Sequence, residues 1–128
     1  MIIKEEELKT CLLFALKPYL EEYGFHILES SLTIENKIFL KALMQYQNQT
    51  FNVDVSFELE YQQYHFVFKE IEGKAKYSFI ELPFMQIFKQ FVKIPNLDVG
   101  DNRCSYPLAL PISQIIMKKN HLIVKIRD

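Results

Sequence analysis

The feature that most constrains the fold is a strict alternation of apolar and polar side chains over residues 51–62. The apolar side chains of this run are Phe51, Val53, Val55, Phe57, Leu59 and Tyr61. Successive side chains of a β-strand point to opposite faces of the sheet, so the run predicts one long strand with one buried face and one face in water. Such one-sided burial favours an antiparallel sheet, because parallel sheets are usually covered on both faces.

Shorter runs with the same period predict further strands of a meander on both sides of the long strand. The expected strands cover residues 25–34, 37–46, 51–62, 64–69, 75–80 and 121–126. The expected turns lie at residues 35–36, 47–49, 62–63 and 72–74. In the return strand we expect Tyr64 to resume the inward-facing pattern, followed by Phe66 and Phe68.

Two segments have helical spacing instead. An N-terminal helix is expected from the glutamates at 5–7, which suit the positive end of a helix dipole, to Gly24, which suits a left-handed C-terminal residue. Its apolar stripe consists of Leu8, Leu12, Ala15, Leu16, Tyr19 and Tyr23. Pro18 predicts a kink or a break into two short helices. A second helix is expected over residues 83–94, with Pro83 in its first turn and Pro95 beyond its end.

The order of these elements predicts an α+β fold. A long curved antiparallel meander sheet would pack against the N-terminal helix and against a second helix near 83–94, which buries both apolar stripes. The chain of 128 residues suits a single domain over residues 1–128, and 49% hydrophobic residues supply a large core.

Composition also bears on partners and location. A net charge of −1 argues against a nucleic-acid binder. No apolar run reaches the roughly 20 residues of a transmembrane helix, and the first residues do not resemble a signal peptide. We therefore expect a cytoplasmic protein, or a soluble fragment of an exported one. Cys11 and Cys104 are expected to be ordinary thiols, with one long-range disulfide as the alternative in an exported chain.

No motif predicts catalysis. The chain contains no phosphate-binding glycine loop, no zinc-protease motif and no nucleophile elbow. His26, His65 and His121 have no paired spacing for a metal, and Glu58 and Glu60 share the water-facing side of the long strand. We expect no enzyme activity, no cofactor and no metal.

The surplus of apolar side chains, with eleven Phe among 128 residues, leaves two interpretations open. The first is a solid core. The second is an apolar cavity between sheet and helix that holds a lipid-like ligand. The residues expected to line it are Phe57, Leu59, Phe66, Phe84, Ile87, Phe88 and Phe91.

The order of elements also resembles a known family. An N-terminal helix leads into the segment Ser31–Leu40, followed by the strand Val53–Leu59, the helix Pro83–Val92 and the strand His121–Ile126. This pattern is similar to small bacterial members of the tubular lipid-binding superfamily. The resemblance implies a strongly curved sheet that wraps a long helix around an apolar groove, with a lipid as the ligand.

We therefore expect a non-enzymatic binding module for a lipid-like or hydrophobic small molecule. The alternative is a protein-interaction or assembly domain, a homodimer or a subunit of a complex, with a solid core and no ligand. It would use an exposed strand edge or the apolar side chains of Phe39 and Leu43.

Overall fold

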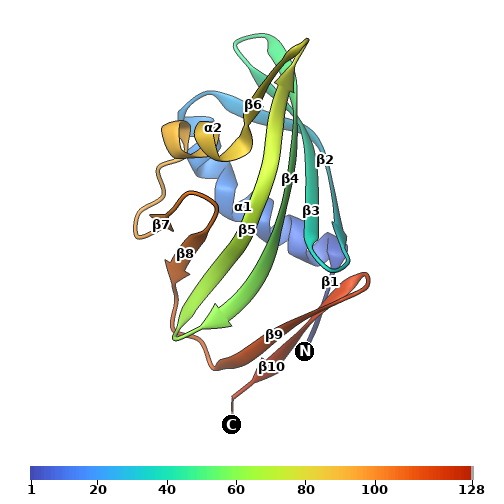
Figure 1. Cartoon of the computed structure of the whole chain (residues 1–128), viewed down its shortest axis with the longest axis vertical. Helices are drawn as coiled ribbons and strands as arrows, with labels where there is room; N and C mark the ends of the chain where they lie inside the picture. The colour runs from blue at the N-terminus through green and yellow to red at the C-terminus, as the bar shows by residue number, and fades with distance from the viewer. Residues whose placement is uncertain (128) are drawn as a thin grey trace.

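The long alternating run forms the centre of a curved antiparallel sheet in the computed structural model, which describes residues 1–127 (Figure 1). The described residues form two helices and ten strands, so the fold is α+β as the sequence predicts. The helices are α1 (Glu5–Glu22) and α2 (Phe84–Phe91). The strands are β1 (Ile2–Lys4), β2 (Phe25–Ile34), β3 (Ile38–Tyr46), β4 (Gln49–Gln62), β5 (His65–Tyr77), β6 (Ile80–Pro83), β7 (Asp98–Val99), β8 (Cys104–Pro107), β9 (Ile112–Lys118) and β10 (His121–Ile126).

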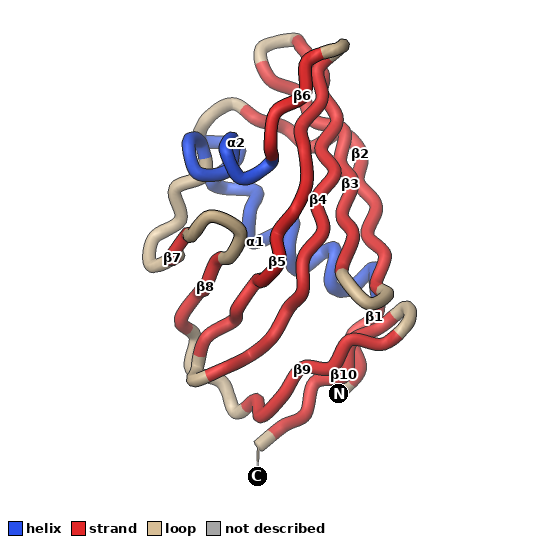
Figure 2. The backbone as a smooth tube through the Cα atoms, in the orientation of Figure 1, coloured by secondary structure: helices blue, strands red, loops and turns tan. Residues whose placement is uncertain are grey.

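The main sheet is a meander with a split edge. Strands β2, β3, β4 and β5 follow one another, and β8 and β7 continue the order beyond β5. Strand β6 pairs with the end of β5 at residues 74–77, whereas β8 pairs with its beginning at 65–68. Figure 2 shows these two short strands at opposite ends of β5, with α2 and the loop after it between them.

Strand β4 buries one face, as its alternation predicts. Val53, Val55, Phe57, Leu59 and Tyr61 are all buried. Opposite Phe57 the partner strand β5 contains an extra residue, because Ser56 pairs with Glu72 while Glu58 pairs with Lys69. Such a bulge bends a strand and increases its twist, which contributes to the curvature of the sheet.

The predicted turn at residues 72–74 is wrong. Strand β5 runs straight through residues 72–74, and Gly73 pairs with Val55 of β4. A Cβ atom at Gly73 would lie 2.1 Å from the carbonyl oxygen of Asp54, so the glycine permits a close approach of two strands and does not make a turn. The chain reverses later, next to Ser78, whose φ is +55°.

The hairpin between β4 and β5 lies one residue later than predicted. Gln63 and Tyr64 have φ angles of +49° and +64°, which are the positive values of a two-residue hairpin turn. Tyr64 therefore lies in the turn with its side chain exposed, and it is not part of the inward-facing row.

Helix α1 continues through Pro18, so the predicted break does not occur. The proline leaves the carbonyl group of Phe14 without its helical donor, but both residues face solvent, where water can satisfy that carbonyl. The start of the helix is fixed by two acids. The Lys4 N–H donates to Glu7 Oε1 at 2.9 Å, and the Ile34 N–H of β2 donates to Glu5 Oε2 at 2.7 Å.

Helix α2 is shorter than the predicted range of 83–94. Pro83 belongs to β6, where it pairs with Lys74, and the helix ends at Phe91. Val92 is already extended, with φ −96° and ψ 109°, and its N–H makes the last helical bond to the Phe88 carbonyl at 2.9 Å.

The two terminal segments form a second sheet in the order β1-β10-β9. Strand β1 was not expected, because a three-residue strand has too few residues to establish a period. The β9–β10 hairpin is held to the main sheet by a hydrogen bond of 2.8 Å from the Asn120 N–H to the Ile34 carbonyl, and β9 lies against β4. Leu122 and Val124 of β10 are nearly fully buried. Among residues 1–127, no helix has the length and apolar character needed to cross a membrane.

Candidate functional site

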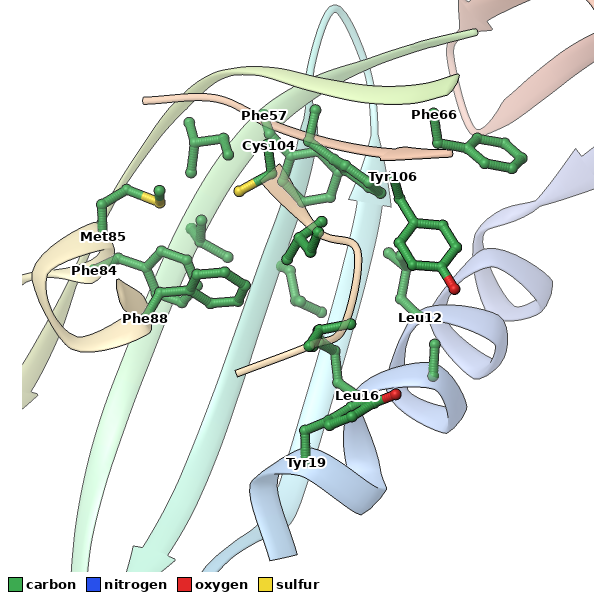
Figure 3. A pocket seen from close by; sticks show the side chains of 17 residues that line it. Leu12, Leu16, Tyr19, Phe57, Phe66, Phe84, Met85, Phe88, Cys104 and Tyr106 are labelled. Carbon is green, nitrogen blue, oxygen red and sulfur yellow. The ribbon is translucent and has the colours of Figure 1, made fainter. Parts of the chain in front are cut away.

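A half-open apolar pocket of about 360 Å³ lies between the two helices, the main sheet and the segment that leads into β8 (Figure 3). Its size falls within the usual range for small-molecule sites. The side chains that line it are Leu12, Ala15, Leu16, Tyr19, Leu40, Val55, Phe57, Phe66, Phe68, Ile71, Phe84, Met85, Phe88, Ile94, Leu97, Cys104 and Tyr106.

Regular spacing brings these side chains together. Leu12, Ala15, Leu16 and Tyr19 recur at intervals of three, one and three, which places them on one face of α1. On the strands neighbouring lining residues are mostly two apart, as with Phe66 and Phe68 of β5, and the bulge in β5 places the next one, Ile71, three residues on. Each periodic element therefore contributes one face to the pocket.

Aromatic pairs form part of the wall. The rings of Phe57 and Phe68, from neighbouring strands, meet edge to face with centroids 5.6 Å apart. Phe84 and Phe88, one turn apart on α2, have centroids 5.5 Å apart. Both arrangements lie in the favourable range for aromatic pairs, so the wall is packed although the space beside it is open.

The lining carries no ionisable acid, lysine, arginine or histidine. Its polar atoms are the hydroxyls of Tyr19 and Tyr106 and the thiol of Cys104, all drawn in Figure 3. Burial raises the pKa of the Cys104 thiol to about 11, and the nearby charge of Asp98 acts in the same direction. At neutral pH the thiol is therefore protonated, and the pocket is electrically neutral.

Of the seven residues expected to line a cavity, four line this pocket: Phe57, Phe66, Phe84 and Phe88. Ile87 and Phe91 instead line an adjoining cavity of about 90 Å³, which Phe84 and Phe88 of α2 also line. Leu59 lines neither. It lies farther along β4, within the packed cluster that includes Ile112 and Ile115 of β9, so the second sheet fills the space there.

The two cavities are neighbours separated by shared side chains. The residues common to both linings are Leu16, Leu40, Val55, Phe84 and Phe88. A rotamer change of a shared side chain such as Leu16 or Phe88 would therefore alter the volume of both spaces.

Sequence reasoning missed most of the lining residues, and two groups among them come from parts of the chain that were not expected at the pocket. The α1 group belongs to the predicted helical stripe, so its spacing contained the signal. The second group consists of Ile94, Leu97, Cys104 and Tyr106. Ile94 was expected at the end of the second helix, and no helix or strand was predicted over residues 97–106. Only the path of the chain over the sheet edge brings this group to the pocket, and no local pattern encodes that path.

The charged side chains that form ion pairs lie outside the pocket. Lys69 Nζ is 2.7 Å from Glu60 Oε1 on the outer face of the sheet, and its hydrogen bond holds the pKa of Glu60 below the ordinary value. Asp101 pairs with Lys89 at 3.0 Å. Within residues 1–127 no three His, Cys, Asp or Glu side chains converge on a metal site.

The side chains of His65 and His121 each contact the backbone carbonyl oxygen of the residue two positions earlier in the chain. His65 Nδ1 lies 2.7 Å from the Gln63 carbonyl, and His121 Nδ1 lies 3.0 Å from the Lys119 carbonyl. Both cysteines are free thiols, with Cys11 exposed and Cys104 buried.

The chain was also compared with known proteins. No family model matches it, and neither does any curated protein or solved structure. The geometry and chemistry of the pocket are therefore the basis on which its function must be inferred.

Proposed function

We propose that the protein is a non-enzymatic binding module that holds a lipid-like or hydrophobic small molecule between α1, α2 and the main sheet. The observation that carries this proposal is the apolar pocket of about 360 Å³, which is open on one side. Most of its lining side chains, including Phe66, Phe84 and Phe88, are only partly buried by the protein itself. A ligand would remove that apolar surface from water.

The free energy available suits such a ligand. Each buried CH₂ group contributes about 0.8 kcal/mol. Micromolar binding corresponds to about 8 kcal/mol, which a chain of roughly ten carbons supplies before the costs of association. The order of elements, similar to that of the tubular lipid-binding superfamily, supports the same ligand class. The two free thiols are compatible with a reducing compartment, and we propose the cytoplasm as the location.

Titration with N-phenyl-1-naphthylamine, an uncharged dye that fluoresces in apolar sites, tests the proposal. The variant Ala15→Trp adds a large side chain at the rim of the pocket, at a helix position that is exposed, so it should fold normally. We expect saturable dye binding by the wild type and at least a tenfold loss of affinity in Ala15→Trp.

The matched control is Phe14→Trp, on the neighbouring residue of α1. The Phe14 side chain is 80% exposed and does not line the pocket, so this variant should bind the dye like the wild type. Native mass spectrometry of the protein purified from cells should also reveal a bound lipid. A wild-type protein that neither takes up the dye nor carries a lipid contradicts the proposal.

A second candidate, an interaction or assembly domain, is favoured by different residues. Phe79, at the turn between β5 and β6, is 88% exposed and is followed by the exposed Ile80. Phe39 and Leu43, the residues expected to form an apolar contact surface, are partly buried. Light scattering across a concentration series tests it: a homodimer that Phe79→Ser converts to a monomer supports this function, whereas a wild-type monomer at all concentrations argues against self-association.

A further inference from the structure

Two of the polar side-chain atoms of the pocket, the hydroxyls of Tyr19 and Tyr106, have no hydrogen-bond partner in the part of the protein that the structure describes and are not sealed from solvent. Tyr19 of α1 and Tyr106 of β8 are partly buried lining residues, and within residues 1–127 neither hydroxyl makes a hydrogen bond. Figure 3 shows both hydroxyls on the side of the pocket formed by α1.

Tyr61 shows what a purely structural hydroxyl looks like in this protein. Its Oη donates to the Leu108 carbonyl at 2.6 Å and accepts the Leu110 N–H at 2.9 Å, so the phenol fixes the segment after β8. Tyr77 likewise donates to Gln49 at 2.5 Å. The hydroxyls of Tyr19 and Tyr106 make no such hydrogen bond to another segment, so they remain available to a molecule in the pocket.

The rest of the lining limits the charge of that molecule. No lysine or arginine lines the pocket to pair with a carboxylate or phosphate, and no acid lines it to pair with an amine. The nearby cation Lys89 already pairs with Asp101 outside the pocket. Transfer of an unpaired charge from water into such a site is strongly unfavourable.

We infer that the pocket selects amphipathic molecules whose polar group is uncharged, such as a long-chain alcohol, ester or ketone, with that group hydrogen-bonded to the hydroxyls of Tyr19 and Tyr106. This inference rests on the proposed function and narrows its ligand class. A phenol hydroxyl both donates and accepts, so it can serve a carbonyl oxygen and an alcohol equally well. A free fatty acid in its ionised form finds no cation in the lining, so it is disfavoured to the extent that its carboxylate must leave water.

Three ligands of one chain length test the charge selectivity: 1-decanol, decanoate and decylamine. Each is titrated against bound N-phenyl-1-naphthylamine at pH 7. We expect decanol to displace the dye at least about thirtyfold more effectively than either ion, because only the ions must lose their charge or their hydration to enter. The affinity of decanoate should rise by about tenfold for each pH unit of acidification until the acid is largely neutral.

Two variants test the hydroxyls. Tyr19→Phe and Tyr106→Phe each remove one hydroxyl and keep the ring, so each should weaken decanol binding by about two- to tenfold. Neither should change the affinity for naphthalene, which has no hydrogen-bonding group. Tyr23→Phe is the matched control, because Tyr23 adjoins α1 outside the pocket and its ring packs edge-on against Phe91.

The outcomes separate this inference from the proposed function. Binding of decanoate as tight as that of decanol at pH 7 would overturn the inference while leaving a hydrophobic binding module. Unchanged decanol affinity in both tyrosine variants would overturn the role of the hydroxyls. Failure of the wild type to bind the dye, decanol or naphthalene would overturn the proposed function itself.

Discussion

Cys104 is the residue whose chemistry depends most on the pocket. It is 4% exposed at the pocket wall, and burial raises the pKa of its thiol from 9.0 to about 11. The unfolded chain therefore loses this proton near pH 9, whereas the folded protein keeps it until about pH 11. Stability is fully present below pH 9 and falls as the pH rises through this window, by up to roughly 3 kcal/mol.

We predict that wild-type protein loses this stability between pH 9 and about pH 11, and that Cys104→Ala does not. Urea unfolding at a series of pH values measures the difference. Tyrosine and lysine ionisation affects both proteins alike, so it cancels in the comparison. Cys11→Ala, at an exposed thiol, should follow the wild type. Parallel pH profiles of wild type and Cys104→Ala would contradict the assignment.

At the scale of elements, the close approach of β4 and β5 depends on Gly73. An added Cβ would lie 2.1 Å from the Asp54 carbonyl oxygen and 2.7 Å from the Val55 Cα, both of them backbone atoms that cannot rotate away. We predict that Gly73→Ala lowers the free energy of unfolding by about 3 kcal/mol, because the two strands must separate. Chemical denaturation measures the loss.

Gly100→Ala provides the control for this prediction. The nearest atom to its added Cβ is the Arg103 carbonyl oxygen at 3.4 Å, and Gly100 does not have a positive φ. Its stability should change by about 0.5 kcal/mol or less. Equal, small effects of both substitutions would show that the strands tolerate a side chain at position 73.

The same strand pair shows how far sequence reasoning reaches. The alternation in β4 was sufficient to identify the strand, its buried face and its antiparallel context, because each of these follows from a local period of two. Gly73 was wrongly predicted to lie in a turn. Sequence alone does not distinguish a glycine in a turn from a glycine at which two paired strands approach closely. What distinguishes the two cases is the pairing of Gly73 with Val55, which lies 18 residues earlier in the chain.

The lining of the pocket also contains residues that a local pattern predicts and residues that no local pattern predicts. Phe84 and Phe88 were found because helical spacing placed them on one apolar face. Tyr106 was not found, because its position depends on how β8 joins the edge of β5. Leu59 was included wrongly in the lining because alternation gives the face of a strand, but it does not show which part of that face another sheet covers.

At the scale of the whole molecule, the pocket lies at the junction of two packed clusters. One contains Leu8, Phe57 and the second sheet, and the other contains Phe25, Met44 and Val53. Phe84 of α2 packs against both. A molecule in the pocket would contact α1, α2 and the main sheet together, so it should stabilise the fold as one unit.

This arrangement predicts a thermal shift. A ligand that binds only the folded state at a concentration of 100 times its Kd stabilises it by about 2.7 kcal/mol. For a chain of this length we expect 1-decanol to raise the Tm by roughly 8 to 12 °C in differential scanning calorimetry. Ala15→Trp, whose affinity is at least tenfold lower, should show about half of this shift or less, while Phe14→Trp should shift like the wild type. A shift of equal size in all three proteins would mean that decanol acts on the surface, because only a ligand inside the pocket can distinguish two neighbouring positions on the same helix.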